Sequence, residues 1–482
     1  MKLLRNNKIY VKYNKMSLIT KASLWFLICS FIQKGINIIV TPIFTRMMTT
    51  TEFGKYNVFT SWEYILNIFV SLCLSAGVYQ QGLVKYEDDM KKFSSSMQGL
   101  TLTLVIISSI IYFIFRKIIN SFLGFDTIYM FSMFFIIWTN NVFAFWSNEQ
   151  KVQFQYKKLI VLTVCISIAT PLLSIFLMKL MIDKVYARIL SSIIVAILFY
   201  TILFWAQMKR GKTFYNKKYW KYAILYNVPL VPHYLSQVIL SSSDRIMIER
   251  LVDSNAAGIY SLAYSIALIM TLFNNSIMQT LSPWMYKKIK EKKIKDISKI
   301  GYASLIAIAL VNLLLIMVAP EAISIFAPNN YHEAMYVIPP VAMSVFFMYT
   351  YDLFAKFEFY YEKTKLIATA TVIGALVNLI LNYIFIKSIG YIAAAYTTLL
   401  CYILYSIFHY FAMVRTCNEK LNGEKPYNFK ILLAISLTFA ILGFSLMIFY
   451  NSFIVRYIFI ALTLFICIIY RKKIIKLIKE IL

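Results

Sequence analysis

The sequence predicts an all-α polytopic membrane protein with about fourteen transmembrane helices. Of its 482 residues, 60% are apolar and only 15% are charged, and the mean hydropathy is +0.69. A soluble globular chain carries roughly 25% charged residues, so this chain has too little polar surface for a water-soluble fold. The apolar residues gather in runs of about 20, the length that crosses a bilayer as a helix. The apolar–polar alternation of membrane strands is absent.

The predicted helices follow one another with short polar connections, and their ends are defined to within about four residues. They cover residues 22–45, 56–78, 96–115, 127–147, 159–178, 188–207, 222–243, 258–282, 300–320, 335–355, 366–386, 391–413, 431–450 and 457–470.

A short pattern near the first helix returns in the second half of the chain. Arg46 precedes a Gly-x-Tyr pattern at 54–56, and Arg250 precedes the same pattern at 258–260 with the same spacing. Each copy follows the first apolar run of a set of six. We therefore interpret the chain as two related halves and a tail. The predicted boundaries are 1–212, 213–417 and 418–482.

The net charge of +28 is explained by loop placement. Most of the 49 Lys and Arg residues fall in loops on the same side as the N-terminus. This bias is the positive-inside signal, so both termini are predicted to be cytoplasmic. The basic run at 287–295 is expected to contact anionic lipid headgroups, with each cation contributing about 1 kcal/mol. Membrane lipids, and no nucleic acid, are the expected partners of these loops.

The first predicted helix carries polar residues that indicate a binding site. Lys34 lies about halfway across the membrane, where a lone lysine costs at least about 2.5–3.5 kcal/mol. Asn37 and Thr41 follow on the same helical face, and Arg46 lies at the outer end. We expect these residues to line a polar cavity. The alternative is a structural ion pair between Lys34 and Glu63 of the second helix.

The second half offers further candidates for substrate binding. Pro229 and Pro232 are predicted to interrupt the seventh helix, and interrupted helices mark binding sites in transporters. Arg250 ends that helix, and Asn275 and Gln279 lie one turn apart on the next.

Carboxylates within the apolar segments are few. Glu63 and Asp352 are the candidates for ion coupling, although Asp352 is expected to pair with Lys356 four residues on. Asp244 and Arg245 are adjacent, and adjacent residues of a helix do not face each other. Each of the two is therefore expected to find another partner.

Asparagines occur in pairs within two helices. Asn140 and Asn141 of the fourth helix are expected either to bridge helices or to line a cavity. Asn378 and Asn382 share one face of the eleventh helix.

The sequence contains no motif for enzymatic or metal chemistry. It has three histidines and no H-E-x-x-H, Walker A, G-x-S-x-G or haem-attachment pattern. Its six cysteines form no C-x-x-C pair, and we interpret them as core residues. The loops are also too short for a catalytic or ATP-binding domain. We therefore expect no enzyme activity, no cofactor and no metal site.

Three connecting segments have expected roles. The mixed-charge segment 79–95 is expected to be a solvated loop. The basic segment 208–221 is expected to link the two halves. Basic residues between 471 and 479 are expected to anchor the end of the chain.

Three stretches of the chain resemble a family of transporters. They are 34-KGINIIVTPIFTRMMTTTEFGKYNVF-59, 244-DRIMIERLVDSNAAGIYSLAYS-265 and 360-YYEKTKLIATATVIGALVNLILNYIFIKSIGYIAAAY-396. Together they are similar to the polysaccharide-biosynthesis flippases of the Wzx type, within the multidrug/oligosaccharidyl-lipid/polysaccharide exporter superfamily. The resemblance covers about residues 18–415. One departure is Gln80–Gln81, where an arginine is expected near the end of helix 2.

The resemblance implies two six-helix bundles around a central cavity, extended by two C-terminal helices, in the bacterial cytoplasmic (inner) membrane. It implies transport of an undecaprenyl-pyrophosphate-linked oligosaccharide, a repeat unit of O-antigen, capsule or a related polysaccharide, by alternating access. The implied partners are this lipid-linked oligosaccharide, membrane lipids, and the polymerase and glycosyltransferases of the pathway. Lys34, Arg46 and Arg250 are the cations that would meet the pyrophosphate.

Two other functions remain open. A cation-coupled drug antiporter of the same superfamily would need buried carboxylates that face the cavity. A non-transport scaffold of a glycan-assembly complex would tolerate neutralisation of Lys34. A major-facilitator sugar transporter is disfavoured, because the G-x-L-x-D-R loop is absent.

The charge asymmetry gives a test of topology. In a background without native cysteines, Cys at positions 215 and 290 should react only from the cytoplasm, because both lie in Lys-rich loops. Cys at position 328 should react with an impermeant maleimide added outside the cell. External labelling at position 290 would contradict the assignment.

Overall fold

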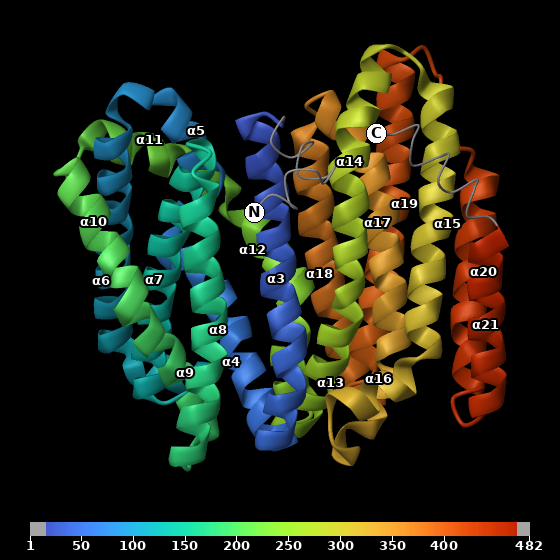
Figure 1. The fold of residues 1–482 in the computed structure, drawn as a ribbon, viewed down its shortest axis with the longest axis horizontal. Coiled ribbons are helices and arrows are strands. Elements are labelled where there is room, and N and C mark those ends of the chain that lie inside the picture. Colours follow the sequence, from blue (N-terminus) through green and yellow to red (C-terminus); the bar gives the residue numbers. More distant parts are fainter. Residues whose placement is uncertain (1–15, 470–482) are drawn as a thin grey trace, which may run out of the picture. The chain divides into compact units, whose positions relative to one another are not determined.

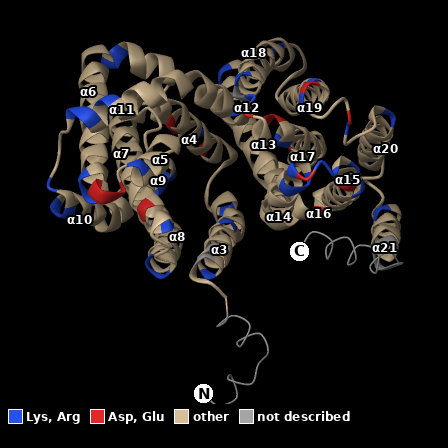
Figure 2. Cartoon of the chain, turned by 90° about the horizontal axis from the view of Figure 1, so that it is seen from above, with Lys and Arg blue, Asp and Glu red and all other residues tan. Residues whose placement is uncertain are grey.

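The computed structural model describes residues 16–469, and these form helices joined by short turns, with no β-strand among them (Figure 1). Twelve helical segments of this part of the chain are long and apolar enough to cross a membrane. The chain is therefore an all-α polytopic membrane protein, as its composition predicts. Most residues along the ribbon are uncharged, and Lys, Arg, Asp and Glu occur at scattered positions (Figure 2).

Two predicted spans are weaker than the rest. The helix α4 (Thr50–Ser71) is not among the twelve, because Lys55, Asn57, Glu63 and Asn67 lower its hydropathy. The last helix, α21 (Phe453–Ile469), contains a shorter apolar stretch, Phe453–Phe465. The predicted basic anchor at 471–479 lies outside the described residues.

The chain divides into two compact units. Unit 1 comprises the residues up to Met47 together with Trp62–Leu235, and unit 2 comprises Met48–Ser61 and the residues from Ser236 onward. The helix α4 therefore begins in unit 2 and ends in unit 1.

The elements of unit 1, besides the second part of α4, follow in chain order. They are α3 (Leu18–Met47), α5 (Gly77–Lys85), η1 (Glu87–Asp89), α6 (Met90–Leu123), α7 (Thr127–Val152), α8 (Tyr156–Leu180), α9 (Lys184–Val195), η2 (Ala196–Tyr200), α10 (Thr201–Gly211), α11 (Lys217–Asn227) and η3 (Val228–Leu230).

The remaining elements belong to unit 2, apart from the first turn of α12. They are α12 (Val231–Leu251), α13 (Ser254–Ala267), η4 (Leu268–Met270), α14 (Thr271–Lys290), α15 (Ile294–Met317), α16 (Ala319–Phe326), η5 (Asn329–Tyr336), α17 (Ile338–Tyr360), α18 (Thr364–Ile389), α19 (Ala393–Lys420), α20 (Phe429–Ile448) and α21.

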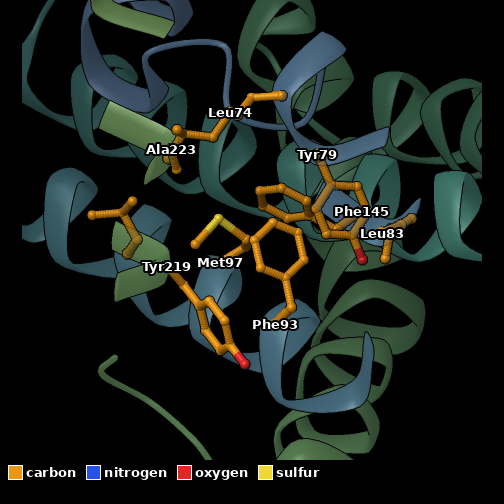
Figure 3. Close-up of a cluster of buried hydrophobic side chains, with 10 residues drawn as sticks. Leu74, Tyr79, Leu83, Phe93, Met97, Phe145, Tyr219 and Ala223 are labelled. Carbon is orange, nitrogen blue, oxygen red and sulfur yellow. The ribbon is translucent and has the colours of Figure 1, made fainter. Parts of the chain in front are cut away.

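The predicted solvated loop at 79–95 is wrong in its first part, because α5 packs into a buried aromatic cluster of unit 1. Tyr79 and Leu83 of α5 meet Phe93 of α6 and Phe145 of α7, and these side chains point toward one another (Figure 3). The rings of Tyr79 and Phe93 stack with centroids 5.8 Å apart. Tyr219 of α11 completes this side of the cluster. The mixed charge of residues 79–95 favoured the prediction of a solvated loop, although one face of α5 is apolar.

The predicted interruption of the seventh helix is confirmed. The 3₁₀ turn η3 separates α11 from α12, with Pro229 inside it and Pro232 at the start of α12. Proline removes a backbone donor and crowds the preceding turn, so regular α geometry is lost here. Residues 217–221 of the predicted linker 208–221 form the start of α11, and the Asn216 side chain caps this helix by accepting from Lys218 N at 3.0 Å.

The helix α17 lies at the centre of unit 2. It contacts α13, α14, α15, α18 and α19, and most of its side chains are buried. Polar groups on α17 therefore need partners within the protein.

Two segments of unit 2 cross so closely that only glycine fits. A Cβ atom on Gly54 of α4 would collide with the carbonyl oxygen of Ser254 and lie 2.8 Å from Gly258 N. A Cβ atom on Gly258 of α13 would collide with the carbonyl oxygen of Thr50. The contact is reciprocal, because each glycine meets the residue four positions before the other. The two glycines of the repeated pattern therefore mark one close crossing of α4 and α13.

We expect Gly54→Ala and Gly258→Ala each to destabilise the protein by roughly 1–3 kcal/mol, because the added methyl group overpacks the crossing. Gly35→Ala in α3 is the matched control, since its Cβ would meet nothing within 4 Å and alanine favours a helix by about 1 kcal/mol. Thermal unfolding of the purified proteins measures the difference. Wild-type stability of both crossing variants would contradict the close contact.

Candidate functional site

Lys34 lies near the middle of the membrane-crossing segment Thr20–Met47 of α3. Its side chain is exposed, and within residues 16–469 it makes no hydrogen bond or ion pair. Asn37, one turn on, is also exposed. The Thr41 hydroxyl donates to the carbonyl oxygen of Asn37 at 2.7 Å, which holds it against its own helix. Of these three candidates, Lys34 and Asn37 therefore have side chains that a ligand can reach.

The alternative ion pair between Lys34 and Glu63 is not formed. Glu63 of α4 accepts a hydrogen bond from Nδ2 of Asn140 on α7, at 3.0 Å. The next residue, Asn141, donates to Oδ1 of Asn67 at 2.8 Å. These two amides bridge α7 to α4, which settles the choice left open by the sequence in favour of helix bridging.

Two arginines lie near the same end of α3. Arg46 is exposed, and its guanidinium donates to the carbonyl oxygen of Pro42 at 2.9 Å. Arg188 of α9 places its guanidinium carbon 4.0 Å from the centroid of the Phe44 ring, a cation–π contact. Arg188 borders a basic loop, so its sequence position alone does not mark it as a site residue. Its aromatic partner is 144 positions earlier in the chain, so no local pattern connects them.

The other substrate-binding candidates belong to unit 2. Arg250 at the end of α12 is exposed, as are Asn275 and Gln279 of α14. The neighbouring Asn274 is buried and donates to the carbonyl oxygen of Val345 at 2.9 Å. The helix thus separates two adjacent asparagines, one fixed in the core and one available to a ligand.

A second polar centre of unit 2 surrounds Asp244 of α12, which is fully buried. Its carboxylate accepts hydrogen bonds from the Tyr260 hydroxyl at 2.6 Å and from Asn382 Nδ2 at 2.6 Å. The Thr398 hydroxyl donates to it as well, at 3.0 Å. The cluster continues to Asn378, whose Oδ1 accepts from Asn382 Nδ2 at 3.2 Å. Helices α12, α13, α18 and α19 all contribute to it.

Arg245 does not pair with Asp244, as expected for adjacent helical residues. Its guanidinium donates to the carbonyl oxygen of Ser241 at 2.9 Å and lies 4.4 Å from the centroid of the Tyr264 ring. Asp244 therefore has hydrogen-bond donors but no direct cationic partner among the described residues. Buried carboxylates normally have a cation or a proton, whereas the groups bonded to Asp244 are neutral, two hydroxyls and one amide. With one carboxylate, the cluster suits a proton or a monovalent cation.

Asp352, the other ion-coupling candidate, is neutralised within its own helix. Lys356 Nζ lies 2.7 Å from Asp352 Oδ1 on α17, as the four-residue spacing predicts. Within the described part of the chain, no group of three or more His, Cys, Asp or Glu residues is arranged to hold a metal ion.

Comparison with known proteins agrees with this architecture. The family model described as "Polysaccharide biosynthesis protein" matches residues 19–289, and the MatE model matches residues 229–384. An uncharacterized membrane protein of Haemophilus influenzae is 22% identical over 377 residues, which cover 76% of this chain and 89% of that protein.

Solved structures show the same fold. The lipid II flippase MurJ, in an inward closed conformation, has a TM-score of 0.69 at 16% identity, covering 94% of this chain and 99% of that one. An inward-facing multidrug resistance transporter of the MATE family has a TM-score of 0.59 at 13% identity. The match covers 81% of this chain and 96% of that transporter. At these identities the likeness concerns the fold.

We expect Asp244→Ala to destabilise the protein strongly, because it leaves three buried donors unpaired at about 1–3 kcal/mol each. Asp352→Ala is the control, since that carboxylate is partly exposed and belongs to a pair within one helix, worth about 0.3–0.5 kcal/mol. Thermal unfolding of the purified proteins measures both. Equal losses in the two variants would contradict the special role of the Asp244 cluster.

Proposed function

Because the chain belongs to the polysaccharide biosynthesis protein family, we propose that it is a flippase for a lipid-linked oligosaccharide. It moves a repeat unit attached to undecaprenyl pyrophosphate across the bacterial cytoplasmic membrane, by alternating access, for O-antigen, capsule or a related polysaccharide. The observation that carries this proposal is the family match over residues 19–289. A fold shared with a flippase whose substrate is another lipid-linked precursor, lipid II, supports it.

The chemistry of such a substrate explains an exposed lysine in mid-membrane. The pyrophosphate head must cross roughly 30 Å of hydrocarbon, where an unpaired anion is very costly. A fixed cation lowers this cost, and its attraction is far stronger in a low-dielectric region than in water. Lys34 has the required charge, depth and accessibility. In this proposal Arg46 and Arg250 receive the head near the outer surface.

In this proposal, neutral polar side chains bind the sugars of the substrate. Asn37, Asn275 and Gln279 are exposed amides on membrane-crossing helices. An amide both donates and accepts hydrogen bonds, so it can bind sugar hydroxyls without adding charge. Glycosyltransferases that build the substrate on the cytoplasmic side and a polymerase that consumes it outside are the pathway partners of this proposal.

A cation-coupled drug antiporter is the second candidate, and one observation favours it. The MatE match at 229–384 contains Asp244, Asn378 and Asn382, the buried oxygen cluster that suits a proton or monovalent cation. The same cluster also serves a cation-coupled flippase. The substrate therefore distinguishes the two functions: deletion of the gene should abolish surface polysaccharide and leave resistance to cationic drugs unchanged. The reverse result would favour the antiporter.

Substitution of Lys34 tests the role of the cation. In a deletion strain, Lys34→Ala and Lys34→Glu should abolish polysaccharide export at normal protein level, because the head loses its counter-charge. Lys34→Arg should retain partial export, because the charge stays but the flexible ammonium is lost. Lys117→Ala, which removes an exposed lysine near the end of α6, is the control and should export normally.

A second experiment exchanges the charges of Lys34 and Glu63 in a double variant. The double variant Lys34→Glu with Glu63→Lys should not restore export, because Glu63 is bonded to Asn140 and not to Lys34. Full export by Lys34→Ala would end the proposed role of the lysine and favour a scaffold. Restoration by the exchange would instead establish a structural ion pair.

A further inference from the structure

A buried acid–base pair joins the two central helices of unit 2. Glu358 of α17 and His409 of α19 are 0% and 1% exposed, and Oε1 of the glutamate lies 2.7 Å from Nδ1 of the histidine. The two other polar atoms, Glu358 Oε2 and His409 Nε2, are also buried and have no hydrogen-bond partner within residues 16–469. Buried polar atoms nearly always have a hydrogen-bond partner. The presence of two such atoms without a partner in one Glu–His pair therefore requires an explanation.

Aromatic rings surround the imidazole. Tyr351 of α17 stacks on it with centroids 5.5 Å apart, and Tyr405 of α19 meets it edge-on at 4.5 Å. Phe408 lies at 5.6 Å. Aromatic faces stabilise a cation in a desolvated site. These rings therefore favour a charged imidazole more than aliphatic side chains in the same place would.

Within the described residues, the other Asp, Glu, Lys and Arg side chains of α17 and α19 make no ion pair with Glu358 or His409, and Lys420 is exposed at the end of α19. Asp352 and Lys356 of α17 bind each other, and Glu419 of α19 binds Lys363 and Arg415 at its exposed end. From α18, the neutral hydroxyl of Thr371 lies 3.0 Å from the Tyr405 hydroxyl.

The helices α13, α14, α15 and α20 also pack against α17. Among the described residues, none of their ionisable side chains makes a hydrogen bond or ion pair with Glu358 or His409. The charge of the pair is therefore set by its own protons.

Unit 1 also contains a buried acid–base pair that joins two helices, α7 and α10. Glu149 of α7 is 1% exposed and lies 3.1 Å from Nη1 of Arg210 on α10. Gln207 Nε2 donates to the same carboxylate at 2.6 Å. Arginine stays protonated at every accessible pH, so this pair is permanent. The pair in unit 2 instead contains histidine, the side chain that titrates near neutral pH.

We propose that Glu358 and His409 form a proton-binding site that controls the packing of α17 against α19. Without the proton, the pair is a carboxylate and a neutral imidazole with a net charge of −1. Proton uptake at Nε2 forms an imidazolium, so the net charge becomes zero and no other bond changes. A buried net charge weakens the packing. Protonation therefore favours the closed α17–α19 contact, and proton loss releases it at the helix ends predicted to be cytoplasmic.

The role of this site in transport rests on the proposed function. The protein contains no ATP-binding motif, and a proton gradient is an energy source that such a site can use. Binding of the proton itself does not depend on what the protein carries, so the two claims can be tested separately.

Histidine-selective NMR of the full-length protein in nanodiscs tests proton binding directly. The chain has three histidines, and His409→Gln and His332→Gln assign two of the signals. The His409 signal should show gain and loss of a proton as the pH is varied, and Glu358→Gln should shift or abolish that change. The exposed His332 should titrate identically in wild type and Glu358→Gln. A His409 signal that stays in one protonation state throughout would overturn the proposal, since the pair would be structural only.

Thermal unfolding measures the linked change in packing. Because protonation favours the closed contact in this proposal, the wild-type unfolding temperature should fall as the pH is raised and the proton is lost. Most of this dependence should disappear in His409→Gln and Glu358→Gln and persist in His332→Gln. An unchanged dependence in both pair variants would overturn the proposal. Polysaccharide export is scored separately: loss of pH dependence with normal export separates the proton site from the proposed function, and would overturn its role in transport.

Discussion

The absence of water from the hydrocarbon layer is the constraint on which this structure depends. Backbone groups there must be satisfied within the chain, and a helix does so without neighbours. Side chains that are polar need partners from other helices or access to an aqueous space. Asp244, with donors from three other helices, follows the first course. Lys34 is exposed and has no hydrogen-bond or ion-pair partner within residues 16–469.

Polar side chains with a partner on another helix can be distinguished from those without one. Asn140 and Asn141 join α7 to α4, and Asp352 is neutralised by Lys356, so these groups stabilise the fold. The Asp244 cluster contains a carboxylate without a direct cationic partner among the described residues. Such a group costs stability unless a cation or a proton neutralises it.

The sequence could predict the helices and many of the local pairs, because both depend on residues close in the chain. Fourteen apolar runs predict the spans, and the spacing of Asp352 and Lys356 predicts their contact. It could not predict that α5 is buried, because its core partners Phe93, Phe145 and Tyr219 come from three other helices. Nor could it predict the Glu358–His409 pair, whose members are separated by 51 positions. Neither residue belongs to a recognisable motif.

By itself, the sequence determined the class of protein and the order of its helices, because hydrophobicity and local spacing are properties of short segments. Tertiary structure alone decided which polar side chains from different helices meet. Arg46 and Arg250 share a motif, yet only the three-dimensional crossing makes Gly54 and Gly258 reciprocal partners. Lys34 and Glu63 are a plausible pair by sequence, but Asn140 is the group that reaches the carboxylate. Which partner a buried charge finds depends on how helices distant in sequence pack, and no local pattern contains that information.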